Sequence, residues 1–123
     1  MCATLYCAAS LAHFFHNAEF CGDYPNLPAW ISRASVYAVW IGLTAFGGTG
    51  LLLSRSRHAA LGLTLVAVYA AMGFDGLGHY TLAPMSQHSF TMNFTIWFEV
   101  VTGAVLLAAT LRALAVRRQP KPL

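Results

Sequence analysis

Ionisable and amide side chains gather in three stretches of an otherwise apolar chain. Neutral imidazole and carboxylate groups suit zinc, iron and copper as ligands, and they also carry protons in general acid–base catalysis. One centre for metal binding or proton transfer is therefore predicted where the three stretches meet. Their polar members are His13, His16 and Glu19 in the first stretch, Asp75 and His79 in the second, and His88, Asn93 and Glu99 in the third.

The spacing within the first two stretches favours helix faces that point at one centre. His13 and His16 are three residues apart, and Glu19 continues that face with some drift. Asp75 and His79 are four residues apart, which also places them on one face of a helix. At about 1.5 Å per residue, His13 lies roughly 9 Å below Glu19, so the predicted cluster has depth.

The third stretch adds one deep carboxylate. If a helix already begins at His88, then Glu99, eleven residues later, returns to nearly the same angle about three turns deeper. Gly73, Gly76 and Gly78 surround Asp75 in the second stretch, and they allow either the close approach of a ligand or a break in the helix.

A transition metal, namely zinc, iron or copper, is the first expectation for this centre. The cluster contains no cysteine, which argues against a structural zinc site with thiolate ligands and favours a site with an open coordination position. The candidate acid–base residues are Glu19, Asp75 and Glu99. The predicted metal ligands are His13, His16, Glu19, Asp75, His79 and His88.

Four other functions fit the same residues. A b-type haem needs His13 or His16 opposite His79, with a slot flanked by small residues. A metal-free enzyme would use a His/carboxylate pair as acid and base on a lipophilic substrate. A proton or ion transporter would use these groups as stepping points, and a structural subunit of a membrane complex would use them as a polar network. The small residues beside the haem slot would be Ala9, Ala12, Gly76 and Gly78.

The elements that must position these residues are transmembrane helices. Hydrophobic residues make up 58% of the 123 residues and charged residues only 9%, far from the roughly one quarter charged of soluble domains. A span needs about 20 mainly apolar residues. The sequence predicts an all-α, four-helix transmembrane bundle over residues 1–116, followed by a basic cytoplasmic tail over 117–123. The expected helices cover about 3–21, 34–53, 59–82 and 90–111.

Arginine and lysine positions predict the orientation. Basic loops stay in the cytoplasm, so Arg55 and Arg57 place the second loop inside, together with the basic tail. Arg33 is the one basic residue that does not fit this orientation, because it lies near the outer end of the second helix. Both termini are therefore expected to be cytoplasmic, in the cell inner membrane, with the His/carboxylate cluster in the outer half of the bilayer. Tyr24, Trp30 and Tyr80 would join an outer aromatic belt.

The expected partner is the lipid bilayer. The net charge is +3, but the basic residues form short clusters between apolar runs, which argues against nucleic-acid binding. A transport pathway in so small a chain would need a homodimer or a larger membrane complex. The run of glycines at 47–50 lies within an apolar span and precedes no lysine, so it indicates helix packing and no phosphate loop.

Four short segments of the chain form a recognisable order: 16–20 (HNAEF), Tyr24-Pro25, Trp30 and the segment from Asp75 to His79. This order resembles the small HXXEE membrane proteins. The sequence departs from the family signature at Phe20, where a second glutamate would stand. The resemblance implies a polytopic membrane fold with no established reaction, and it supports His16, Glu19 and His79 as part of a site.

Overall fold

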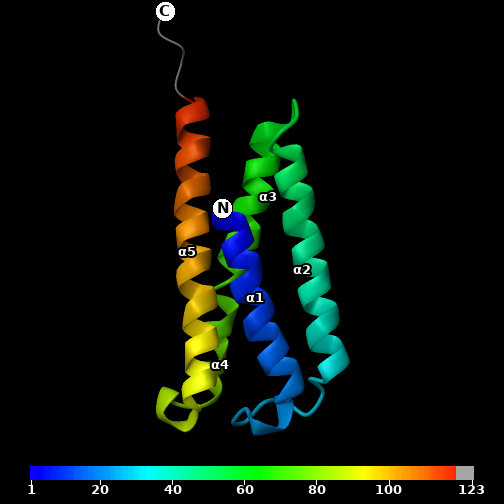
Figure 1. The fold of residues 1–123 in the computed structure, drawn as a ribbon, viewed down its shortest axis with the longest axis vertical. Helices are drawn as coiled ribbons and strands as arrows, with labels where there is room; N and C mark the ends of the chain where they lie inside the picture. The colour runs from blue at the N-terminus through cyan, green and yellow to red at the C-terminus, as the bar shows by residue number, and fades with distance from the viewer. Residues whose placement is uncertain (119–123) are drawn as a thin grey trace, which may run out of the picture.

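The computed structural model describes residues 1–118, and every regular element in that part of the chain is helical. Four long helices run side by side (Figure 1): α1 (Cys2–Glu19), α2 (Arg33–Leu53), α3 (Ala59–Met72) and α5 (Phe90–Arg118). Helices α1 and α3 each pack against both α2 and α5. The all-α prediction is confirmed. Residues 119–123 of the predicted basic tail lie outside the described residues.

Short helical segments complete the chain where the long helices turn. They lie in the half of the bundle opposite the loop between α2 and α3 (Figure 1). These segments are η1 (Cys21–Asp23), η2 (Asp75–Gly78), α4 (His79–Leu82) and η3 (Met85–Gln87).

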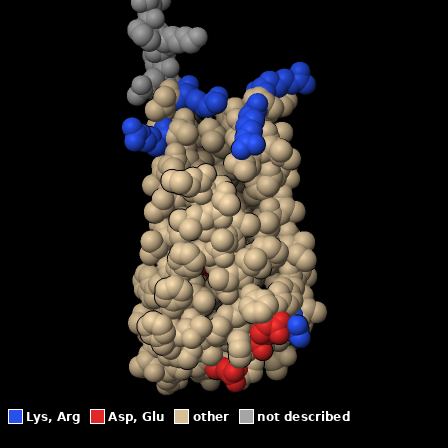
Figure 2. All heavy atoms as spheres, viewed as in Figure 1, with Lys and Arg blue, Asp and Glu red and all other residues tan. Residues whose placement is uncertain are grey.

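Three stretches of the described chain are long and apolar enough to cross a membrane. They are Arg33–Leu53, Ala59–Leu82 and Phe90–Arg117, with mean hydropathies of 1.6, 1.6 and 1.8. Helix α1 has 18 residues but is not among these three stretches, and its second half carries His13, His16 and Glu19. Figure 2 shows most Lys and Arg side chains at one end of the molecule and acidic side chains near the other end, where a basic side chain lies beside them; the surface between the two ends carries almost none of these charged residues. Large apolar side chains such as Ile41 and Phe94 are more than half exposed, as expected where lipid replaces water. The chain is thus built as a membrane protein.

Glycines bring α2 and α3 into close contact near the basic end. A Cβ on Gly62 would collide with the backbone of Leu53 and Ser54, and one on Gly50 would lie 3.0 Å from the backbone nitrogen of Val66. A Cβ on Gly47 would overlap the ring of Tyr69. The prediction that the glycine run serves helix packing is confirmed for Gly47 and Gly50.

The third predicted helix is broken in the structure. Helix α3 ends at Met72, and a 3-10 turn over 75–78 precedes the short helix α4. Glycines weaken the helix here, and Gly73 packs so tightly that a Cβ would lie 2.8 Å from Cε2 of Tyr6. As a result, Asp75 and His79 do not share a regular α-helical face: Asp75 is exposed, whereas His79 is buried.

Two other boundaries differ from the predicted ones. The first helix ends at Glu19 and the last one continues to Arg118. Helix α5 begins at Phe90, so His88 precedes it in extended backbone. The helical-angle relation between His88 and Glu99 therefore does not apply, because His88 is positioned by its loop.

Candidate functional site

A buried pair of ionisable groups lies where α1 meets α5. The Nε2 atom of His13 is 3.9 Å from Oε2 of Glu99, and the two side chains are 4% and 2% exposed. Gly76 of the broken segment covers the pair: its ideal Cβ would lie 3.6 Å from His13 Nε2 and 3.8 Å from Glu99 Oε2. Such a pair is costly to bury, and the glycine leaves room beside it.

His79 extends the pair toward the end of the bundle. Its ring meets that of His13 edge to face, with centroids 5.5 Å apart. Its Nε2 lies 3.1 Å from the amide nitrogen of Asn17. With the amide donating, Nε2 accepts and Nδ1 carries the proton of a neutral imidazole. Asn17 on α1 thereby fixes the orientation of a histidine from α4.

Tyr24 contacts three histidines of the cluster. Its side chain is 3% exposed, and its hydroxyl shares a hydrogen bond of 3.0 Å with Nδ1 of His16. Its ring lies 4.7 Å from that of His79 and 6.4 Å from that of His88. Burial raises the pKa of Tyr24, so the hydroxyl keeps its proton. The prediction that Tyr24 belongs to an aromatic belt at the surface is wrong, because the loop folds its ring inward.

His88 is held from its own loop. Its Nδ1 lies 3.1 Å from the carbonyl oxygen of Pro84, to which it donates, since a carbonyl only accepts. Asn93 donates its amide to the backbone carbonyl of His88 at 3.2 Å. The ring of His88 lies 6.2 Å from that of His79, and the side chain is buried. This arrangement leaves Nε2 with a lone pair that faces the interior.

Three buried polar atoms of the cluster have no hydrogen-bond partner among the described residues. They are Nδ1 of His13, Nε2 of His88 and Oδ1 of Asn17. Leaving a buried polar group unpaired costs about 1–3 kcal/mol, and three such atoms in one cluster are unusual for a purely structural network. The cluster is thus suited to exchange protons or to bind a polar group.

A cavity of about 250 Å³ opens beside the cluster, between α1, α2 and the broken segment. Its polar lining consists of His13, Asn17, Ser35, Asp75 and His79. The rest of its wall is mostly apolar and aromatic, as in sites for small molecules. These apolar lining residues are Phe14, Trp30, Ile31, Val36 and Val39.

Glu19 lies apart from the buried cluster. Its carboxylate pairs with the Arg33 guanidinium at 2.8 Å and accepts a hydrogen bond of 2.7 Å from the Tyr37 hydroxyl. Arg33, the one basic residue that does not fit the predicted orientation, thus has an acidic partner on α1. These contacts turn Glu19 toward α2, and the predicted role of Glu19 beside the histidines has no geometric support.

The six predicted metal ligands do not form one preorganised centre. Within residues 1–118, no three His, Cys, Asp or Glu side chains converge closely enough to hold a metal ion together. The structure brings His13, His79 and His88 near one another, places His16 against Tyr24, and leaves Asp75 at the exposed cavity wall. The rings of His13 and His79 meet edge to face with centroids 5.5 Å apart, so a haem between them would require the rings to move apart, and the haem with His16 stays a prediction.

Asn17 and Tyr24 are the site residues that sequence reasoning missed. Asn17 follows His13 by four residues, so helical spacing alone places the two on one face. Tyr24 gave no such signal, because it lies in the loop after α1 and its inward direction depends on the tertiary fold.

Comparisons of the chain with protein-family models, with curated proteins and with solved structures found no match. The resemblance to the HXXEE proteins therefore stays a prediction.

Proposed function

We propose that the chain is a membrane protein whose His13–Glu99 pair acts as acid and base on a lipophilic substrate, which enters the cavity from the bilayer. The observation that carries this proposal is the composition of that cavity, in which imidazole, amide and carboxylate groups stand among mostly apolar side chains. A molecule with an apolar body and one polar head matches this lining.

The chemistry follows from which nitrogens of His13 are engaged. Nε2 faces Glu99 at 3.9 Å, whereas Nδ1 has no partner among the described residues. A proton taken up at Nδ1 creates an imidazolium, which the Glu99 carboxylate stabilises from the opposite side. A carboxylate behind an imidazole has this role in catalytic triads. His79, held by Asn17, would orient the polar head of the substrate.

The proposed setting is the cell inner membrane, with four spans and both termini in the cytoplasm. The exposed residues Arg55, Arg57, Arg112 and Arg117 lie at the end of the bundle where α2 and α5 finish, which supports that end as the cytoplasmic one. Helix α1 would be the fourth span because it packs between α2 and α5. An alkaline phosphatase fusion at the C-terminus should be inactive in this orientation.

The proposal is tested by nuclear magnetic resonance of the protein in nanodiscs with ¹⁵N-labelled histidine. Decanol, decanoic acid and decylamine serve as probes, because they share one chain length and differ in the polar head. At least one probe should shift the His13 and His79 signals saturably.

A blocked cavity provides the matched control. Val39 and Ile41 lie on the same helix and are both more than half exposed, but only Val39 lines the cavity. Val39→Trp should abolish the shifts and Ile41→Trp should leave them unchanged. If no probe moves the histidine signals, or if both variants respond like the wild type, the acid–base proposal fails.

A transition metal is the second candidate, and the geometry of His88 favours it. A metal-binding histidine usually donates its other N–H to a carbonyl or carboxylate, as His88 does to Pro84. Its unpaired Nε2 and the neighbouring His79 supply two imidazole ligands that suit zinc, iron or copper. A movement of the loop would have to bring in a third ligand.

Elemental analysis separates the two candidates. The protein purified in mild detergent is compared with a His79→Ala/His88→Ala variant and with His58→Ala, which removes an exposed histidine. Stoichiometric metal that is lost only in the double variant would support the metal site. Protein that stays free of metal after incubation with zinc, iron and copper would reject it.

A further inference from the structure

A second cavity of about 260 Å³ lies between α1, α2 and α3, in the half of the bundle near the basic end. Of the α1 residues that line this cavity, Cys7 lies nearest to the first site. It is six residues, or roughly 9 Å along the helix, from His13. Most of its lining is apolar or glycine, and no residue is shared with the first cavity. It is a separate site.

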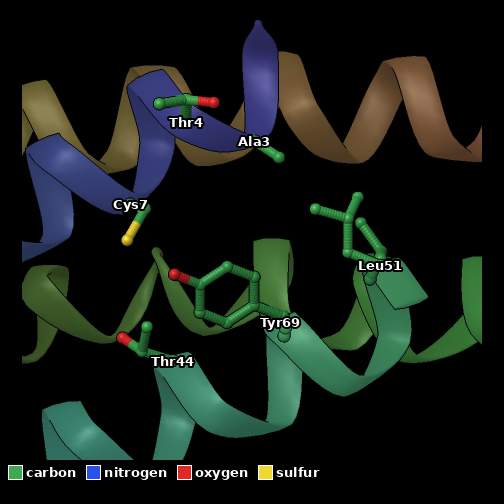
Figure 3. A pocket seen from close by; sticks show the side chains of 9 residues that line it. Ala3, Thr4, Cys7, Thr44, Leu51 and Tyr69 are labelled. Carbon is green, nitrogen blue, oxygen red and sulfur yellow. The ribbon is translucent and has the colours of Figure 1, made fainter.

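Two hydroxyl groups in this cavity lack partners. The oxygens of Tyr69 and Thr44 are buried and form no hydrogen bond with the described residues. Tyr69 is 5% exposed, and Figure 3 shows its hydroxyl pointing between Thr44 and Cys7. Each hydroxyl can donate one hydrogen bond. One hydroxyl can accept from the other, but the remaining O–H group then still lacks an acceptor, and a bound oxygen would supply it.

The cavity is open toward the lipid-facing surface. Thr4 on α1 and Gly48 on α2 line it and are exposed. A Cβ on Gly48 would meet no atom within 4 Å, so this glycine is not needed for helix packing. Gly47 differs, because its missing side chain makes room for the Tyr69 ring. The entrance therefore admits molecules dissolved in the bilayer.

We infer that this second cavity binds a lipid-soluble molecule through a carbonyl or ester oxygen, which accepts hydrogen bonds from Tyr69 and Thr44. The apolar body of the ligand lies against Ala3, Leu51 and Val66. Acyl esters of membrane lipids and lipophilic ketones share this chemistry. The inference is independent of the acid–base site.

Photolabelling in nanodiscs tests this inference. The probe is a long-chain fatty-acid methyl ester with a diazirine on its chain, and a diazirine alkane of equal length serves as the probe without a carbonyl. Mass spectrometry should map ester crosslinks to the α1 and α2 segments that line the cavity. Excess unlabelled methyl ester should compete with them, and an excess of a lipophilic ketone shows whether ketones also bind.

Two variants test occupancy and recognition. Gly48→Leu fills the cavity and should remove the crosslinks, whereas Gly42→Leu, at another open glycine on the same helix, should keep them. Tyr69→Phe and Thr44→Val should each weaken ester labelling by about three- to tenfold, the effect of one lost hydrogen bond. Labelling by the alkane should change little in these two variants.

Three results would overturn the inference: equal labelling of the two leucine variants, no preference for the ester over the alkane, or crosslinks that map elsewhere. Size-exclusion profiles identify any variant that does not fold. If Gly48→Leu is lost in this way, Thr44→Val still decides the role of the hydroxyl groups.

Discussion

His13 on α1 and Glu99 on α5 face each other at 3.9 Å, and almost no part of either side chain reaches the surface. The two residues are 86 positions apart, so only the packing of α1 against α5 brings them together. Beside them lie a cavity and an unpaired imidazole nitrogen. This combination distinguishes the pair from an ion pair that only joins two helices.

Glu99→Gln should separate chemistry from structure. Glutamine has nearly the same shape but cannot stabilise an imidazolium, so the His13 signal should no longer respond to the decyl probes. The fold should persist, because a neutral amide is cheaper to bury than a carboxylate. Histidine ¹⁵N spectra and thermal unfolding in detergent measure the two effects. A variant that responds to the probes like the wild type would show that Glu99 has no part in proton transfer.

Glu19→Gln should have a much smaller effect on the site. The partner Arg33 is 68% exposed, and ion pairs with exposed members contribute about 0–1 kcal/mol. We expect the free energy of unfolding in SDS titrations to fall by no more than about 1 kcal/mol. The response of His13 to the probes should stay intact. Loss of that response would mean that Glu19 takes part in the site, contrary to its pairing with Arg33.

Composition and hydropathy predicted the all-α architecture and three of the membrane-spanning stretches, because apolar run length is encoded locally. The burial of His13, His79, His88 and Glu99 in one cluster was also foreseen in outline. It follows from placing polar residues near the same ends of antiparallel helices. Ionisable groups within a span usually face the interior of the bundle, because exposing them to lipid is costly.

The direction of individual side chains could not be predicted. Glu19 and His13 are six residues apart and point about 120° apart around α1, and the rotation of the helix decides that one pairs with Arg33 while the other faces Glu99. The break after Met72 arises from glycines whose close packing involves Tyr6, a residue on another helix. Tyr24 lies in a loop without periodicity, so its burial depends wholly on tertiary contacts.

Tyr24→Phe should change how stability depends on pH. Burial raises the pKa of Tyr24 above its ordinary value of about 10. The native state therefore favours the protonated phenol, and this stability is present below about pH 10 and is lost as the pH rises further. Phenylalanine cannot ionise, so the free energy of unfolding of the variant in SDS should rise relative to that of the wild type between about pH 8 and pH 11. A constant difference across this range would contradict the burial of the hydroxyl.

Gly62→Ala should be the most damaging of the small substitutions, and Gly42→Ala provides its matched control. A Cβ at position 62 would collide with the backbone of Leu53 and Ser54, which cannot rotate away, so α2 and α3 must separate. Gly42 has no atom within 4 Å of its ideal Cβ, and alanine there should be neutral or stabilise the helix by up to about 1 kcal/mol. For Gly62→Ala we expect a loss of about 1–3 kcal/mol, the usual cost of overpacking. SDS unfolding of both variants measures the difference. Equal stabilities would mean that the contact between α2 and α3 is looser than its glycines indicate.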